Sequence, residues 1–216
     1  MAAPLLADLA HPAHTALITS EVQNGVVGEG SGLPQLAAAA QAIIDPIARL
    51  CAAARDASVP VIHGTATRRA DAAGSNRNAR IFMAMRGSDM PLLPGSPQAQ
   101  VVAELGPEPS DLVLTRVHGL NPMAGTDLDP ILRNLGVTTL IVTGVSVNIA
   151  VTNLVMDAVN LGYQVVLPRD AVVGIPAAYA DAIIDNTLAL LATVTTVDEL
   201  IAVWAAGPSD RDGDPS

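Results

Sequence analysis

Short apolar runs alternate along this chain with longer segments in which apolar residues recur at helical spacing. The short runs predict strands at 15–21, 59–64, 111–116, 138–144, 163–168 and 194–197. The longer segments predict helices at 33–57, 96–105, 126–136, 148–162, 176–193 and 198–207. We expect Pro46 to kink or break the first helix, and we expect a further helical segment around 81–85. Strands that alternate with helices are typical of a parallel sheet covered on both faces.

The pattern indicates a single domain. The 216 residues are enough for one sizeable hydrophobic core, and no internal repeat or linker interrupts the alternation. We predict a domain at 14–206, preceded by an N-terminal arm at 1–13. The polar residues 207–216 are predicted to form a disordered tail.

Hydrophobic residues make up 50% of the chain, and the mean hydropathy is +0.41. No uninterrupted apolar run reaches the ~18 residues that a membrane span needs, so we assign this apolar content to a buried core. The N-terminal segment lacks a basic region and carries Asp8 among its apolar residues, which is not typical of a signal peptide. The single cysteine, Cys51, excludes an internal disulfide. We therefore expect a cytoplasmic protein.

The charged residues of the chain exclude several classes of partner and of catalytic chemistry. Its net charge of −10 argues against binding to nucleic acid or to an anionic membrane. All eleven basic residues are arginine, which excludes Schiff-base, P-loop or general-base chemistry by a lysine. We expect a small-molecule substrate or ligand and no cofactor. We also expect a homo-oligomer (a dimer or tetramer), because the chain is rich in alanine and apolar helix faces and poor in aromatic residues.

Polar side chains stand where predicted strands end, which is where parallel sheets bind ligands. Glu21 closes the first strand, and a carboxylate in such a cleft suits general acid or base catalysis. Arg116 closes the third strand and can hold a substrate carboxylate or stabilise an oxyanion. The alternative is structural: Arg116 simply pairs with Glu21. The segment Gly144–Ala150 follows the fourth strand and leads into a helix.

The histidines near the strand ends do not have metal-ligand spacing. His63 and His118 are isolated in the sequence, so we predict no metal site. We expect one of them to line the pocket and the other to be packed in the interior. Cys51 lies between apolar residues in the middle of a predicted helix and is expected to be a small buried side chain. The basic loop at 68–80 is a candidate cover for the pocket, although a solvated loop is the simpler interpretation.

Three stretches resemble the isochorismatase-like hydrolases, also called cysteine hydrolases. "TALITSEVQNGVVG" resembles the first strand of that superfamily, which ends in an aspartate followed two positions later by glutamine. "LTRVHGLNPMAGTDLDPILRNLGVTTLIVTGVSVNIAV" resembles the stretch with its lysine, its Gly-Thr-x-Leu turn and its cysteine. "DAVNLGYQVVLPRDAV" resembles the segment that follows, and the likeness extends over residues 14–205.

The resemblance implies an α/β fold: a three-layer Rossmann-like sandwich whose six-stranded parallel sheet has the order 3-2-1-4-5-6, with helices on both faces. It also implies an Asp–Lys–Cys triad, but Glu21, Arg116 and Ala150 occupy the three positions here. A cis peptide is implied between Val145 and Ser146, and backbone N–H groups near Ser146 and Ala150 are implied to form an oxyanion hole. The predicted substrate-binding residues are Gln23, His118, Ser146 and Asn148.

Three interpretations remain open at this stage. In the first, the protein is a cysteine-free hydrolase of a small anionic metabolite, with Glu21 as general acid or base. In the second, it is an inactive binding or regulatory protein that keeps the pocket. In the third, the fold serves assembly alone. Replacement of the triad by a charged pair favours a retained polar pocket, and the missing thiol closes the covalent acyl-enzyme route. Ser146 or Thr152 as a substitute nucleophile would need a nearby base, and the local sequence offers none.

Overall fold

The computed structural model describes residues 5–86 and 92–207. The strands are β1 (Thr15–Ser20), β2 (Val61–Ala66), β3 (Leu112–Arg116), β4 (Thr139–Val145), β5 (Gln164–Pro168), β6 (Val172–Val173) and β7 (Thr193–Thr195). The α-helices are α1 (Leu6–Leu9), α2 (Asn24–Val27), α3 (Pro34–Asp56), α4 (Arg80–Arg86), α5 (Leu128–Asn134), α6 (Thr152–Asn160), α7 (Ala177–Asn186) and α8 (Val197–Ala205). A π-helical turn, Val147–Val151, leads into α6.

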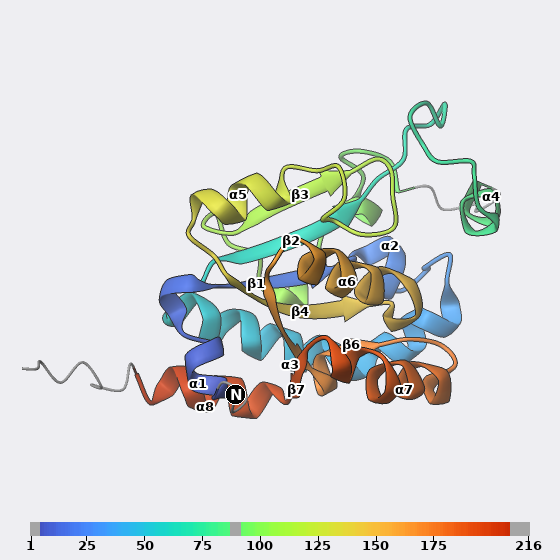
Figure 1. The fold of residues 1–216 in the computed structure, drawn as a ribbon. Coiled ribbons are helices and arrows are strands. Elements are labelled where there is room, and N and C mark those ends of the chain that lie inside the picture. Colours follow the sequence, from blue (N-terminus) through green and yellow to red (C-terminus); the bar gives the residue numbers. More distant parts are fainter. Residues whose placement is uncertain (1–4, 87–91, 208–216) are drawn as a thin grey trace, which may run out of the picture.

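The strands of the described residues form one parallel sheet in the order β3-β2-β1-β4-β5-β7 (Figure 1). Because β7 is the sixth strand expected from the sequence, the predicted order 3-2-1-4-5-6 is confirmed. The short strand β6 pairs with β4 beyond the end of β5 and was not predicted. Two residues are too few to show an apolar pattern.

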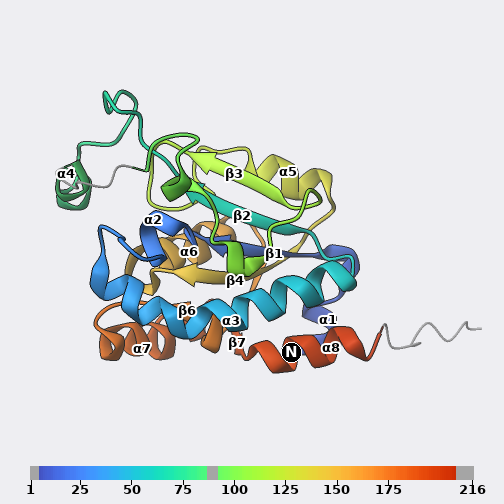
Figure 2. The same ribbon diagram turned by 180° about the vertical axis from the view of Figure 1, so that it is seen from behind.

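The sheet separates two hydrophobic cores, which confirms the three-layer sandwich. Along β1, Leu17 points into one core, whereas Ala16 and Ile18 point into the other. Helices α3 and α8 cover the first core, and α5, α6 and α7 contribute to the second (Figures 1 and 2). This alternation explains why the central strands read as continuous apolar runs in the sequence.

Helix α3 runs unbroken through Pro46, so the expected break is absent from the structure. Its buried residues are Leu36, Ala37, Ala40, Ile43, Ile47, Leu50, Cys51 and Ala54. We infer that packing of this face against the sheet offsets the cost of a proline in the helix interior. By length and composition α3 could cross a membrane, and within the described residues it is the one such helix. Its contacts with the sheet are those of a core helix in a folded domain.

The segment 96–105 differs from the predicted helix. It forms two 3₁₀ turns, Pro97–Ala99 and Ala103–Leu105, with an extended stretch between them. Val101 in this stretch forms an antiparallel bridge with Gln23, and the Val102 N–H donates to the Val22 carbonyl at 3.1 Å. Tertiary hydrogen bonds therefore override the local helical pattern. The helix predicted at 176–193 is also shorter, because α7 ends at Asn186 and a 3₁₀ turn follows.

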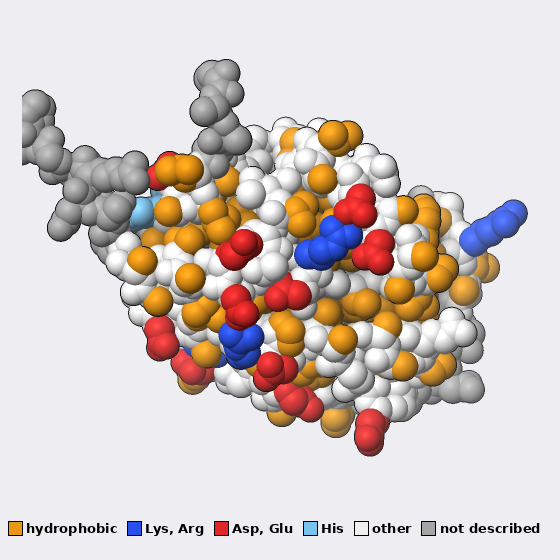
Figure 3. All heavy atoms as spheres, turned by 90° about the horizontal axis from the view of Figure 1, so that it is seen from below, with side chains coloured by type: hydrophobic (Ala, Val, Ile, Leu, Met, Phe, Trp, Pro, Cys, Tyr) orange, Lys and Arg blue, Asp and Glu red, His pale blue; other side chains and the backbone are white. Residues whose placement is uncertain are grey.

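The described part of the N-terminal arm lies against the last helix. Leu9 and Ala10 are buried, and the Trp204 indole N–H donates to the Ala10 carbonyl at 2.8 Å. Most of the predicted tail at 207–216 lies outside the described residues. On the face shown in Figure 3, acidic side chains outnumber basic ones, in line with the negative net charge.

Candidate active site

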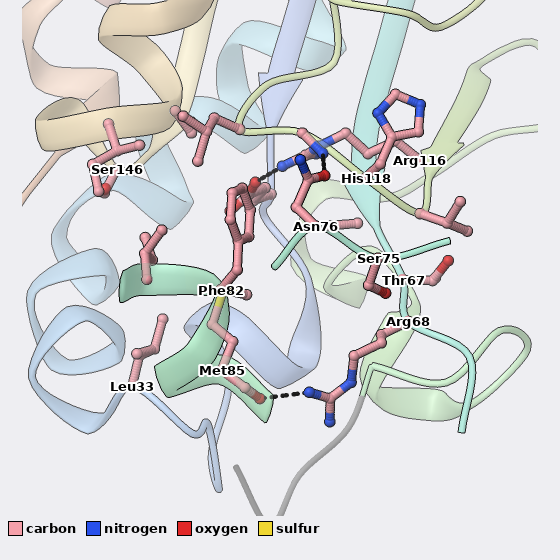
Figure 4. Close-up of a pocket in the computed structure, with 18 of the residues that line it drawn as sticks. Leu33, Thr67, Arg68, Ser75, Asn76, Phe82, Met85, Arg116, His118 and Ser146 are labelled. Atoms are coloured by element: carbon pink, nitrogen blue, oxygen red, sulfur yellow. Dashed lines mark hydrogen bonds and ion pairs between the residues drawn. The ribbon is translucent and has the colours of Figure 1, made fainter. Parts of the chain in front are cut away.

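A cavity of about 150 Å³ lies at the carboxyl ends of the central strands. Glu21 follows β1, Arg116 is the last residue of β3, and Ala150 lies in the π-helical turn after β4. All three line the cavity, as the strand order predicts; Figure 4 labels Arg116 there. Glu21 has a φ of 56°, in the left-handed region that residues other than glycine rarely occupy. The backbone therefore turns sharply where this carboxylate enters the cavity.

Glu21 and Arg116 form an ion pair that leaves much of the guanidinium free. The Arg116 Nη2 donates to Glu21 Oε1. The Arg116 side chain is 4% exposed and that of Glu21 is 20% exposed. The Nε and Nη1 atoms of Arg116 are buried, and neither has a hydrogen-bond partner among the described residues. The pair is therefore not the closed, two-bond arrangement that a purely structural role would favour.

The turn that carries Ala150 has the backbone that the resemblance implies. The Val145–Ser146 peptide bond is cis, and Ser146 and Ala150 both line the cavity. Gly144 has a φ of 99°, and a Cβ built there would lie 2.3 Å from the Ser20 carbonyl oxygen, so only glycine allows β4 to approach β1 here. The side chain at position 150 is a methyl group, where the resemblance implies a cysteine.

Two predicted substrate-binding residues, Gln23 and Asn148, lie outside the cavity lining. The buried Gln23 amide donates to the carbonyls of Ala66 (3.0 Å) and Ala99 (2.8 Å) and accepts from the Ala66 N–H. The Asn148 amide donates to the Ile175 carbonyl at 2.7 Å and accepts from its N–H. Both amides connect backbone segments, and their predicted contact with a ligand stays a prediction.

The two histidines take the two roles expected of them. His118 is exposed and lines the cavity. His63 is fully buried in β2, with its Nδ1 2.8 Å from Thr19 Oγ1 and its Nε2 3.2 Å from Asp111 Oδ2. Burial lowers the pKa of His63 below its usual value, although the Asp111 carboxylate opposes that shift.

Sequence reasoning did not assign the apolar wall of the cavity. This wall consists of Leu33, Leu36, Ile81, Phe82, Met85 and Ile149. The 68–80 loop also contributes, through Arg68, Ser75 and Asn76, although a solvated loop was the simpler interpretation of its sequence. The spacing of Ile81, Phe82 and Met85 is that of one helix face, which is the signal that could have found them.

No group of three or more histidine, cysteine, aspartate or glutamate side chains within 5–86 and 92–207 could hold a metal ion. The cavity instead combines one carboxylate, one buried guanidinium and the backbone of the turn after β4. Such a set can bind an anion and transfer a proton.

Comparison with known proteins places this geometry in a family. Residues 15–199 match the family model of the isochorismatase domain. The ureidoacrylate amidohydrolase RutB of Variovorax paradoxus is 29% identical over 212 residues, covering 90% of this chain and 83% of that protein. The protein of the same name from an Enterobacter species is 32% identical over 176 residues, covering 74% and 75%. A cysteine hydrolase structure from Pseudomonas syringae pv. phaseolicola superposes with a TM-score of 0.83 at 26% identity, covering 95% of this chain and 99% of that one.

Proposed function

Since this chain belongs to the isochorismatase family of hydrolases, we propose that it hydrolyses a small anionic metabolite without a cysteine nucleophile, with Glu21 as general acid or base. The observation that carries this proposal is the buried Arg116 guanidinium, whose Nε and Nη1 have no partner among the described residues. A buried donor without a partner is costly, and a carboxylate oxygen can accept a charge-assisted hydrogen bond from either atom. The relatives' name, ureidoacrylate amidohydrolase, denotes a substrate that carries a carboxylate.

The proposed reaction uses water in place of a thiol. The water oxygen adds to the substrate while Glu21 accepts a proton from that water. Glu21 then donates the proton to the leaving group as the bond to it breaks. Arg116 stays protonated throughout and balances the negative charge of the substrate. The backbone N–H groups of the turn containing Ser146 and Ala150 are the proposed partners of the developing oxyanion. None of these steps needs a side chain at position 150.

A binding protein without turnover is the second candidate. It is favoured by Ala150 at the nucleophile position and by the direct contact between Glu21 and Arg116. In this alternative the spare donors of Arg116 still hold an anion, but Glu21 only balances the charge of the guanidinium. The two candidates therefore predict the same ligands and differ in whether the bound ligand is hydrolysed.

The test is a panel of small carboxylates that contain a carboxamide, carbamoyl or vinyl ether bond. Thermal shift identifies ligands, and product formation is then measured for each. We expect Glu21→Gln to lower turnover at least about 100-fold, because the amide cannot titrate. The control is Glu29→Gln, which makes the same change at an exposed position outside the cavity lining. Ligands that bind with no turnover would identify a binding protein, and equal turnover in Glu21→Gln would remove Glu21 from the mechanism.

We also propose that the chain self-associates. Edge strand β3 and the residue after it expose Leu112 (37%), Val113 (54%) and Val117 (39%). An edge strand with exposed apolar side chains is a surface that another chain can cover. Light scattering at micromolar concentration should give at least a dimer, and a monomeric mass would contradict the proposal.

A further inference from the structure

The cavity has a polar end and an apolar end. The polar end holds Glu21 and Arg116, and the apolar wall was defined above by side chains from the start of α3, from α4 and from the π-helical turn. A substrate that only presented a carboxylate and a small polar group would leave this wall in contact with water. The apolar wall therefore indicates that the rest of the ligand is apolar.

Helix α4 supplies much of the apolar wall and lies apart from the two cores. It stands away from the sheet in both ribbon views (Figures 1 and 2). Its cavity-lining residues Ile81, Phe82 and Met85 belong to neither of the cores formed by the described residues, and Met85 is 44% exposed. An amphipathic helix normally buries its apolar face against other protein groups. Here that face borders the cavity instead.

Arg68 holds α4 in this position. Its Nη1 donates to the Met85 carbonyl at 2.7 Å, at the carboxyl end of the helix, and its backbone N–H donates to the Leu92 carbonyl at 2.7 Å. In Figure 4 the Phe82 side chain points from α4 towards the end of the cavity where Arg116 lies. Met83, on the same helix, is 54% exposed and does not line the cavity.

We infer that the ligand is a carboxylate bearing an apolar group, and that Phe82 determines specificity by contacting that group. The inference rests on the proposed function only in taking Arg116 as the partner of the carboxylate. Phe82 is the only phenylalanine of the chain and offers a flat, rigid surface at the end of the cavity wall. An apolar group packed against it would remove both surfaces from water.

Affinity along a homologous series tests this inference. Acetate, butyrate, hexanoate and the neutral hexanamide are titrated at constant ionic strength into protein with isotope-labelled methionine methyl groups. Each methylene that becomes buried should increase affinity, up to about fourfold. Hexanoate should therefore bind at least about tenfold more tightly than acetate. The Met85 methyl signal should shift with hexanoate, and that of Met83 should not. Equal affinities for acetate and hexanoate would overturn the inference.

Matched substitutions on α4 isolate the role of Phe82. Phe82→Ala should reduce the hexanoate-to-acetate affinity ratio at least about fivefold, because the ring is the largest apolar surface on this helix. Phe82→Leu should restore most of the ratio, which a mere loss of folding would not allow. Met83→Ala is the control and should keep the wild-type ratio. An unchanged ratio in Phe82→Ala would remove Phe82 from the specificity site.

Hexanamide separates this inference from the proposed function. If hexanoate binds no better than hexanamide, the role of Arg116 as an anion site fails, whatever the chain-length dependence shows. If carboxylates bind selectively but with no dependence on chain length, the proposed function stands and the inference about Phe82 fails.

Discussion

Two groups of charged residues lie beside the same sheet and differ in how many of their hydrogen-bonding atoms have partners. At the carboxyl edge, Arg116 contacts Glu21 through one nitrogen, and two of its buried nitrogens have no partner among the described residues. On the α3 side, Asp111 accepts from Arg55 Nε (3.1 Å), Arg55 Nη2 (2.8 Å) and the Glu108 N–H (2.9 Å), and also contacts His63. The second group is satisfied, whereas the first is not.

The group around Asp111, in which all hydrogen-bonding atoms named above have partners, contains residue types that are common in catalytic sites. Thr19, His63 and Asp111 follow one another in a hydroxyl–imidazole–carboxylate chain. However, Thr19 is 1% exposed, His63 is fully buried, and neither lines the cavity. A nucleophile that no substrate can reach cannot act in catalysis. We therefore propose that the Thr19–His63–Asp111 hydrogen bonds stabilise the fold. We therefore use unused donors beside a cavity, and not residue types alone, as the basis for proposing a ligand site.

The largest expected effect comes from breaking the satisfied group. Asp111→Asn should lower the free energy of unfolding by about 3 kcal/mol, because it removes the buried charge partner of Arg55 and leaves only the exposed Glu108 at 4.0 Å. The measurement is urea unfolding followed by circular dichroism. Asp198→Asn breaks the exposed pair with Arg49 and should leave the free energy of unfolding almost unchanged. An equal loss of unfolding free energy in the two variants would show that the group of Asp111, Arg55 and His63 does not stabilise the fold.

Acid should weaken the same group by a smaller amount. Burial holds the pKa of His63 below its usual 6.5, so the unfolded chain binds the proton more readily than the folded one. The contribution of neutral His63 to the free energy of unfolding is therefore fully present above about pH 6.5, and it is lost as the pH is lowered below that value. Burial acts to raise the pKa of Asp111, but bonds from Arg55, the Glu108 N–H and His63 hold it below its usual 3.8. This adds a further loss at still lower pH.

The pH prediction is checked by urea midpoints at about pH 7.5, 6.5 and 5.5 in the wild type and in His63→Asn. The wild-type midpoint should fall across this range, and the fall should be smaller in the variant, which lacks the titrating imidazole. A wild-type midpoint that rises as the pH is lowered would contradict the assignment of His63 as a buried neutral group.

The same contrast explains which parts of the structure could be predicted from the sequence. Glu21 and Arg116 were found because they directly follow apolar runs, and parallel strands bring their carboxyl ends to one edge. The order of the strands came from the resemblance to a known family, since apolar periodicity does not specify which strands pair. The extended stretch at 100–102 was missed because its partners, Val22 and Gln23, are far away in the sequence.

Two of the predicted substrate-binding residues show the same limitation. Gln23 and Asn148 are polar and lie near strand ends, but their partners are backbone groups at Ala66, Ala99 and Ile175. No local pattern reveals such partners. Phe82 was missed for the opposite reason, since it lies on a helix between strands, far from any strand end, and reaches the cavity only because of how α4 is placed.

Introducing a thiol at position 150 should make the cavity reactive towards alkylating agents but should not give efficient amide hydrolysis. In Ala150→Cys, the nearby Arg116 and the helical turn favour a thiolate, so we expect one equivalent of iodoacetamide to react at position 150. Efficient hydrolysis of nicotinamide or a carbamoyl compound is not expected, because Arg116 cannot exchange protons near neutral pH. Mass spectrometry and product assays measure the two effects. Amidase turnover by this single variant would show that the chain lacks only its cysteine.

The smallest expected effect is that of iodoacetamide on the wild type. Cys51 is fully buried in α3, and burial raises the pKa of its thiol to about 12, although Arg55 opposes the shift. A protonated, inaccessible thiol does not react, so the native protein should gain no mass and any turnover should survive the treatment. In urea the same protein should gain one adduct, which confirms that the reagent is active. Labelling of the native protein would show that α3 opens readily from the sheet. That result would contradict the packing on which the satisfied group of Arg55 and Asp111 depends.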